Sequence, residues 1–115
     1  MFHKLLLLSI LLISSIKGID ASKVRFGNLT TFKKGQSVSV VDSKKIYAEI
    51  PYYKTIIKKN LKKGTAEYTQ LMLKATELYK GTLGKSGLSL IVEFDGVDTT
   101  LHKTEDVTTK IISLL

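Results

Sequence analysis

The chain has 115 residues, with 18 lysine and arginine side chains against 10 aspartate and glutamate side chains, and its net charge is +8. It contains no cysteine, which excludes disulfide bonds and a lipid-modified cysteine. The length fits one small domain, whose stability must come from apolar packing and, in an oligomer, from further burial between protomers.

The N-terminus has the composition of an export signal. Residues 1–4 are short and basic, residues 5–16 form an apolar run broken only by serines, and small residues follow. This is the order of a signal peptide, and the run is shorter than the roughly 20 apolar residues that a membrane-spanning helix needs. We expect residues 1–21 to be a signal peptide that is cleaved after Ala21 or, as a second choice, after Gly18. The alternative is a short membrane anchor that is never cut.

The positive charge of the remaining chain indicates which partners it could attract. Lysine-rich surfaces favour acidic proteins, anionic lipid, lipopolysaccharide or nucleic acid. Nucleic acid is the least expected of these for an exported chain, so we predict no nucleic-acid partner. Charge alone does not choose among the others.

Residues 22–36 are polar and basic and precede the first clear strand. Val24 and Phe26 alternate with polar residues, which fits an edge strand of a sheet. A disordered N-terminal arm is the alternative.

A β-branched run over residues 38–41 predicts a short strand that ends at Asp42. Asp42 or Ser43 is then expected to cap a helix by accepting a backbone hydrogen bond. That helix is short, because Pro51 follows and disfavours a helical residue before it. Pro51 is tolerated in the first turn of a new helix, so we predict a joint between two helices there.

The longest periodic stretch begins after Pro51. Its apolar residues recur three and four positions apart, as in a coiled-coil seam: Tyr53, Ile57, Leu61, Tyr68, Leu71, Ala75 and Leu78. Gly64 and Thr65 interrupt the seam after a lysine-rich turn, which is typical of one helix ending and another beginning. We predict two antiparallel helices over residues 52–63 and 66–81, with one continuous helix as the alternative. Helices of this length would reach about 20 Å.

The C-terminal third reads as strands followed by a helix. We expect Gly81, Gly84 and Gly87 to end the helical region, and residues 88–94 to form a strand that pairs with residues 38–41. Asp95-Gly96 is a preferred two-residue hairpin turn and predicts a return strand over Val97–Leu101.

The last residues predict a helix. Residues 104–108 offer several helix caps, and Lys110–Leu115 continue as an apolar helix. The predicted order is therefore strand, short helix, helical hairpin, β-hairpin and helix.

Three segments, in this order, resemble the Skp/OmpH family of periplasmic chaperones. The first is a strand ending in Val-Asp before a short helix and a proline, carried here by Val41, Asp42, Lys45, Ile46, Tyr47, Glu49 and Pro51. The second is the strand after the helices, carried by Gly87, Leu88, Leu90, Ile91 and Val92. The third is the C-terminus, carried by Asp106, Val107, Thr108, Ile111, Ile112 and Leu115.

The resemblance implies an α+β fold with a small β-sheet body, a short projecting helical hairpin and a C-terminal helix. The residues assigned to the body are Val40, Ile91, Val92 and Ile112. The resemblance also implies that the protein forms a homotrimer and lies in the periplasm. Its implied function is that of an ATP-independent holdase, which keeps unfolded outer-membrane proteins from aggregating. The arm of this chain is much shorter than those of the family. The alternative function is a small exported interaction protein that binds an envelope component or an anionic surface without chaperone activity.

Candidate contacts with a client lie on the helical arm: Lys54, Lys58, Lys59, Lys62, Lys63 and Tyr52. Lys54, Lys58 and Lys62 lie four residues apart and predict a basic stripe on the first arm helix. The stripe would attract acidic clients or anionic head groups, or it would be a solvated helix face. The other arm tyrosines would contact a client or pack the helical seam.

The sequence offers little for catalysis, and we expect no enzyme, no cofactor and no metal site. His102 is the only histidine after the predicted cleavage site. Asp95 and Asp98 fit a turn, and Glu105 and Asp106 fit a helix cap, better than they fit paired catalytic carboxylates.

Overall fold

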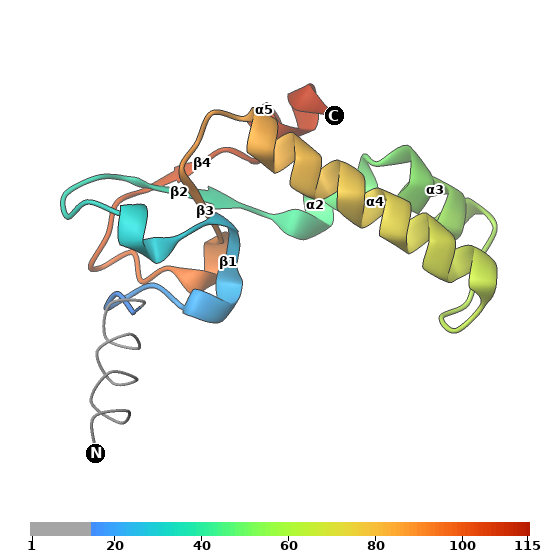
Figure 1. The fold of residues 1–115 in the computed structure, drawn as a ribbon, viewed down its shortest axis with the longest axis horizontal. Coiled ribbons are helices and arrows are strands. Elements are labelled where there is room, and N and C mark those ends of the chain that lie inside the picture. Colours follow the sequence, from blue (N-terminus) through green and yellow to red (C-terminus); the bar gives the residue numbers. More distant parts are fainter. Residues whose placement is uncertain (1–14) are drawn as a thin grey trace, which may run out of the picture. The chain divides into compact units, whose positions relative to one another are not determined.

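A computed structural model describes residues 15–115 of the chain (Figure 1). The predicted signal segment lies largely outside these residues. The described chain forms two compact units, which we call the sheet unit (residues up to 41 and residues 89–106) and the helical unit (residues 42–88 and 107–115). No helix within residues 15–115 is long and apolar enough to cross a membrane.

The fold is α+β, as predicted. Its strands and α-helices are β1 (Val24–Gly27), β2 (Val38–Val41), α2 (Ser43–Ala48), α3 (Pro51–Lys58), α4 (Ala66–Lys85), β3 (Leu90–Glu93), β4 (Thr104–Asp106) and α5 (Thr108–Leu114). Within residues 15–115, three short 3-10 helices accompany them: η1 (Ala21–Lys23), η2 (Leu29–Thr31) and η3 (Phe94–Gly96).

The sheet unit contains a four-stranded mixed sheet with the strand order β1-β3-β2-β4. The predicted pairing of the two apolar strands is confirmed: β2 lies parallel to β3, with Val40 opposite Val92. β1 pairs antiparallel with β3 at one edge, which confirms an edge strand in the segment 22–36 and excludes the disordered arm. An ion pair of 3.1 Å between Arg25 and Glu93 also links these two strands.

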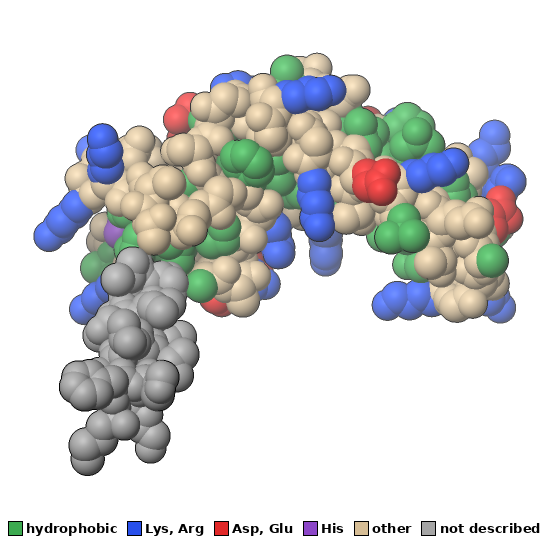
Figure 2. Space-filling view, in the orientation of Figure 1, with side chains coloured by type: hydrophobic (Ala, Val, Ile, Leu, Met, Phe, Trp, Pro, Cys, Tyr) green, Lys and Arg blue, Asp and Glu red, His purple; other side chains and the backbone are tan. Residues whose placement is uncertain are grey.

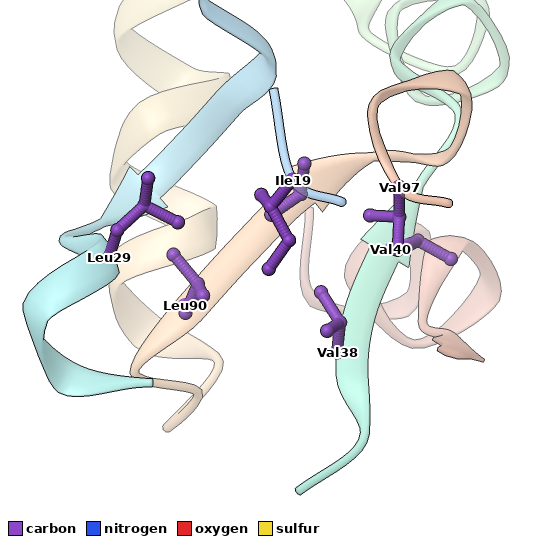
Figure 3. Packing of buried hydrophobic residues seen from close by; sticks show 7 residues of the cluster. Ile19, Leu29, Val38, Val40, Leu90 and Val97 are labelled. Atoms are coloured by element: carbon purple, nitrogen blue, oxygen red, sulfur yellow. The ribbon is translucent and has the colours of Figure 1, made fainter. Parts of the chain in front are cut away.

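Apolar side chains from one face of the sheet form the core of this unit. Val38 and Val40 of β2 and Leu90 and Val92 of β3 point to the same side, because side chains alternate along a strand. Figure 3 shows Ile19, Leu29 and Val97 gathered with them. On the opposite face, Val41 and Ile91 are also fully buried.

The predicted β-hairpin after β3 is wrong. Neither Asp95 nor Gly96 has the positive φ that a tight I′ turn requires, and the residues form η3 instead. Gly96 serves close packing, because a Cβ there would lie 2.4 Å from the Cβ of Lys23. Val97 bridges to Ile19 rather than to β3. The next strand is β4, where the sequence indicated helix caps, and it lies parallel to β2.

The helical unit confirms the predicted hairpin of two helices, α3 and α4, and excludes the single continuous helix (Figure 1). α3 ends at Lys58, five residues before the predicted end at residue 63, because Asn60 takes the left-handed conformation with φ 51°. The N–H of Asn60 donates to the carbonyl of Ile57 (3.1 Å), and that of Leu61 donates to the carbonyl of Ile56 (3.0 Å). These two bonds are the Schellman pattern that closes a helix C-terminus.

α4 is longer than predicted, because only one of the three glycines ends it. Gly87, with φ 78°, follows the C-cap Ser86, whereas Gly81 and Gly84 lie inside the helix. Each internal glycine costs about 1 kcal/mol relative to alanine. Burial of Thr82 and Leu83 on the adjoining face offsets that cost. With 20 residues, α4 is about 30 Å long.

The joint between α2 and α3 and the C-terminal helix α5 agree with the predictions from the sequence, but the N-cap of α2 does not. Pro51 is the first residue of α3, as expected, and α5 confirms the C-terminal helix. Asp42 occupies the N-cap position of α2, but its side chain makes no capping hydrogen bond. Its backbone N–H donates instead to Oγ1 of Thr108, 2.9 Å away, which ties α2 to the start of α5.

Candidate functional site

The helical unit carries large apolar side chains in solvent. Ile57 of α3 is 64% exposed and Leu73 of α4 is 60% exposed. The predicted seam is wrong at this point: it placed Ile57 between the helices, but in α3 Ile56 is the buried residue and Ile57 faces outward. Figure 2 shows apolar and lysine side chains lying side by side on this unit.

A cluster of three tyrosines fixes the surface beside Ile57. The rings of Tyr47 and Tyr79 stack, with centroids 4.9 Å apart and planes 14° apart. Tyr53 meets Tyr47 edge-on, with centroids 5.9 Å apart. The hydroxyl of Tyr79 shares a hydrogen bond of 2.6 Å with that of Ser43, so three helices hold the cluster.

Two adjoining hollows lie over this cluster, and we call them together the tyrosine groove. The first has a volume of about 330 Å³ and is lined by Ala48, Tyr53, Lys54, Ile57 and Lys58. The second has a volume of about 410 Å³ and is lined by Ser43, Lys44, Tyr47, Ala48, Tyr53 and Met72. They share Ala48 and Tyr53, so α2, α3 and α4 contribute to one mainly apolar depression.

Lysines are the only charged residues that line the groove: Lys44, Lys54 and Lys58. Lys54 also pairs with Glu49, at 3.3 Å and with both side chains exposed, so this surface pair contributes little energy. Lys58 makes no ion pair within residues 15–115. A carboxylate held near the groove would therefore meet Lys58 without first displacing a protein carboxylate.

The structure separates the predicted client contacts into two groups. Lys54 and Lys58 line the groove, but Lys62 and Lys63 lie in the α3–α4 loop, so the predicted stripe along one helix is wrong beyond Lys58. The helix stops at the Schellman turn, which moves these two lysines off its face. Lys59 caps α3 and pairs with Glu67 across the loop at 2.9 Å.

Tyr52 lies outside the groove. Its side chain is 38% exposed, and the Nζ of Lys74 sits 5.9 Å from its ring centroid. Sequence reasoning missed Ala48, Ile57 and Met72 as groove residues. Periodicity within one helix could not have found them, because they come from the three helices α2, α3 and α4.

Several of the other residues that carry the sequence resemblance have structural roles. Ile46 is fully buried, Gly87 supplies a positive φ, and Asp106 lies opposite Val40 in the sheet. Lys45 is exposed on α2. Ile112, which was assigned to the body, lies on α5 and belongs to the helical unit.

Asp98 and His102 of the sheet unit are engaged in local structure. The hydroxyl and backbone N–H of Thr100 donate to Asp98 and hold the pKa of that carboxyl below its ordinary value. His102 contacts the carbonyl of Lys17 through Nε2 at 2.7 Å and meets Phe32 edge-on. Among residues 15–115, no three His, Asp or Glu side chains gather in a way that could hold a metal ion.

Comparison of the chain with protein-family models, with curated proteins and with solved structures finds no match. The features of the chain that bear on its function are the tyrosine groove, the lysines that line it and the three sequence motifs. In the groove, apolar surface, aromatic rings and positive charge lie together.

Proposed function

We propose that the protein is an ATP-independent holdase that binds unfolded polypeptides through the tyrosine groove. In a Gram-negative envelope its clients are unfolded outer-membrane proteins in the periplasm. The observation that carries the proposal is an apolar groove, built on packed tyrosines and lined by Lys44, Lys54 and Lys58, that stays open in the folded protomer.

The size of the groove suits a segment of unfolded chain. Hollows of about 330 and 410 Å³ fall at the low end of the range for small-ligand sites, about 300–1,000 Å³. Each has room for an aliphatic or aromatic side chain of a client. The apolar contact supplies attraction at roughly 25 cal/mol per Å² of buried surface, so each contact is weak and reversible.

The lysines select the clients. An apolar side chain flanked by Asp or Glu presents carboxylates to Lys54 and Lys58 as it enters the groove. Such charges raise the rate of encounter and are screened within about 10 Å at 0.1 M salt. Binding should therefore weaken with salt and persist in part through the apolar contact.

Assembly follows from the resemblance to the Skp/OmpH family, which supports a homotrimer. The helical hairpins of three protomers would present three grooves to one client, and linked weak sites bind far more tightly than single ones. A 30 Å helix cannot enclose a whole barrel protein, so the trimer would cover segments of a client rather than cage it.

The direct test is suppression of aggregation. An unfolded outer-membrane barrel is diluted from denaturant with and without the protein, and light scattering is followed. We expect suppression near one trimer per client, partly reduced at 0.5 M salt. No suppression would remove the holdase. Binding to anionic lipid vesicles without suppression, abolished by salt, would instead support the small surface-binding protein.

A further inference from the structure

We infer that residues 16–21 are a permanent part of the folded domain, so that any removal of the leader occurs no later than the Ser15–Ile16 bond. The sequence places the cleavage after Ala21 or Gly18. In the sheet unit, however, Ile19 is 93% buried, since only 7% of its surface is exposed, and it lies in the core with Val40 and Leu90 (Figure 3).

Main-chain hydrogen bonds also hold residues 18–20 in place, in addition to the burial of the Ile19 side chain. The N–H of Asp20 donates to the carbonyl of Gly96 at 2.8 Å, and the N–H of Asp98 donates to the carbonyl of Gly18 at 2.7 Å. Between these two bonds, Ile19 lies antiparallel to Val97. Residues 18–20 therefore act as a short strand for residues 96–98, which have no other strand partner among the described residues.

The small residues that resemble a cleavage site have structural reasons of their own. Gly18 has φ 85° in a turn closed by a 3.1 Å bond from the N–H of Ile19 to the carbonyl of Ile16. That position favours glycine, and a Cβ there would lie 2.9 Å from Cδ1 of Leu101. Ala21 opens η1, whose N-cap is Asp20 with its side chain accepting the N–H of Ser22.

A cut after Ala21 would therefore expose the core it leaves behind. It would remove Ile19, the strand partner of Val97 and the cap of η1 together. A cut after Gly18 would keep Ile19. It would remove the turn that precedes Ile19 and the Gly18 carbonyl that accepts a hydrogen bond from the N–H of Asp98. Cleavage at or before the Ser15–Ile16 bond leaves every one of these contacts intact.

The test uses the full chain, exported in a bacterial host and recovered from the cell envelope. Intact mass and N-terminal sequencing give the first residue of the wild-type protein. We expect a chain that retains Ile16 to Ala21. A mature protein beginning at Ser22 or Ile19 overturns the inference.

Two matched variants test the structural half of the inference. Ile19→Asp places a carboxylate in the core and should lower Tm by more than about 8 °C. Ala21→Asp adds the same group at an exposed position and should not change Tm. An Asp directly before the scissile bond would block a cut after Ala21. Because we expect no cut there, the N-terminus of this variant should be that of the wild type. If Ile19→Asp is not recovered, Ile19→Val should still lower Tm by a few degrees. Equal Tm values for the wild type and the Ile19 variant contradict the inference.

Discussion

Tyr47 of α2 stacks on Tyr79 of α4, with ring centroids 4.9 Å apart and planes 14° apart. Tyr79 is buried, whereas Tyr47 is half-buried and lines the tyrosine groove. The ring pair therefore joins two helices, and its Tyr47 ring also lines the proposed client site.

Removing Tyr47, the half-buried member of that pair, should affect stability and binding together. Tyr47→Ala loses the stacking and a 3.2 Å hydrogen bond to Thr76, so we expect a loss of about 2 kcal/mol in the free energy of unfolding. Chemical denaturation measures it. Tyr47→Phe keeps the ring and should lose about 1 kcal/mol or less while retaining client binding.

Two exposed apolar residues allow an experiment to distinguish binding in the groove from binding elsewhere on the helical hairpin. Ile57 lines the groove and Leu73 does not, although both are about equally exposed. Ile57→Asp and Leu73→Asp should each change stability by no more than about 0.5 kcal/mol. Only Ile57→Asp should reduce suppression of client aggregation. An equal effect of the two would place the client elsewhere.

Charge reversal at the groove should act on the rate of encounter. Lys58→Glu should lower the association rate for an acidic client several-fold at low salt, and the difference should shrink as salt rises. Lys80→Glu makes the same change on α4 outside the groove and serves as its control. Stopped-flow fluorescence with a labelled client measures both rates, and a salt-independent difference would argue against the electrostatic explanation.

The end of α3 depends on a left-handed residue. Asn60→Ala should lose about 1 kcal/mol of stability, because a Cβ without the local hydrogen bonding of asparagine disfavours φ 51°. Asn60→Gly should be as stable as the wild type or slightly more so. Thermal unfolding of both variants checks this, and a more stable alanine variant would mean that the turn is not left-handed.

The pKa of Asp98 gives a test in the sheet unit. Its lowered pKa means that the carboxylate stabilises the fold above its unfolded value near 3.8, and this contribution is lost as pH falls through the lower folded value. Thr100→Val removes the hydroxyl donor and should raise the pKa of Asp98 toward 3.8. An NMR titration of the carboxyl measures the shift, and an unchanged pKa would show that the hydroxyl is not its cause.

Local patterns predicted the parts of the fold that local chemistry controls. The β-branched run at 38–41 correctly predicted β2, and Pro51 predicted the joint between α2 and α3. Thr65 predicted the start of α4. The pairing of β2 with β3 also followed, because both are short apolar strands that only a shared sheet can bury.

The errors arose where a residue had two uses. Asp95-Gly96 has the composition of a turn, but its glycine is needed for contact with Lys23. Gly18 and Ala21 also have two uses, since they have the composition of a cleavage site and they shape a turn and a 3-10 helix; the position of cleavage stays a prediction. The groove escaped prediction because Tyr47, Ile57 and Met72 come from three helices whose angles are set by packing, and sequence spacing does not encode those angles.

The most direct test of the tyrosine groove uses the absence of cysteine in the chain. Ile57→Cys and Leu73→Cys each introduce a single thiol at an exposed position, and each can carry the same photo-crosslinker. Illumination with an unfolded outer-membrane barrel should link the client to position 57 and leave position 73 largely free. Equal crosslinking at both positions, or crosslinking at position 73 alone, would contradict the account.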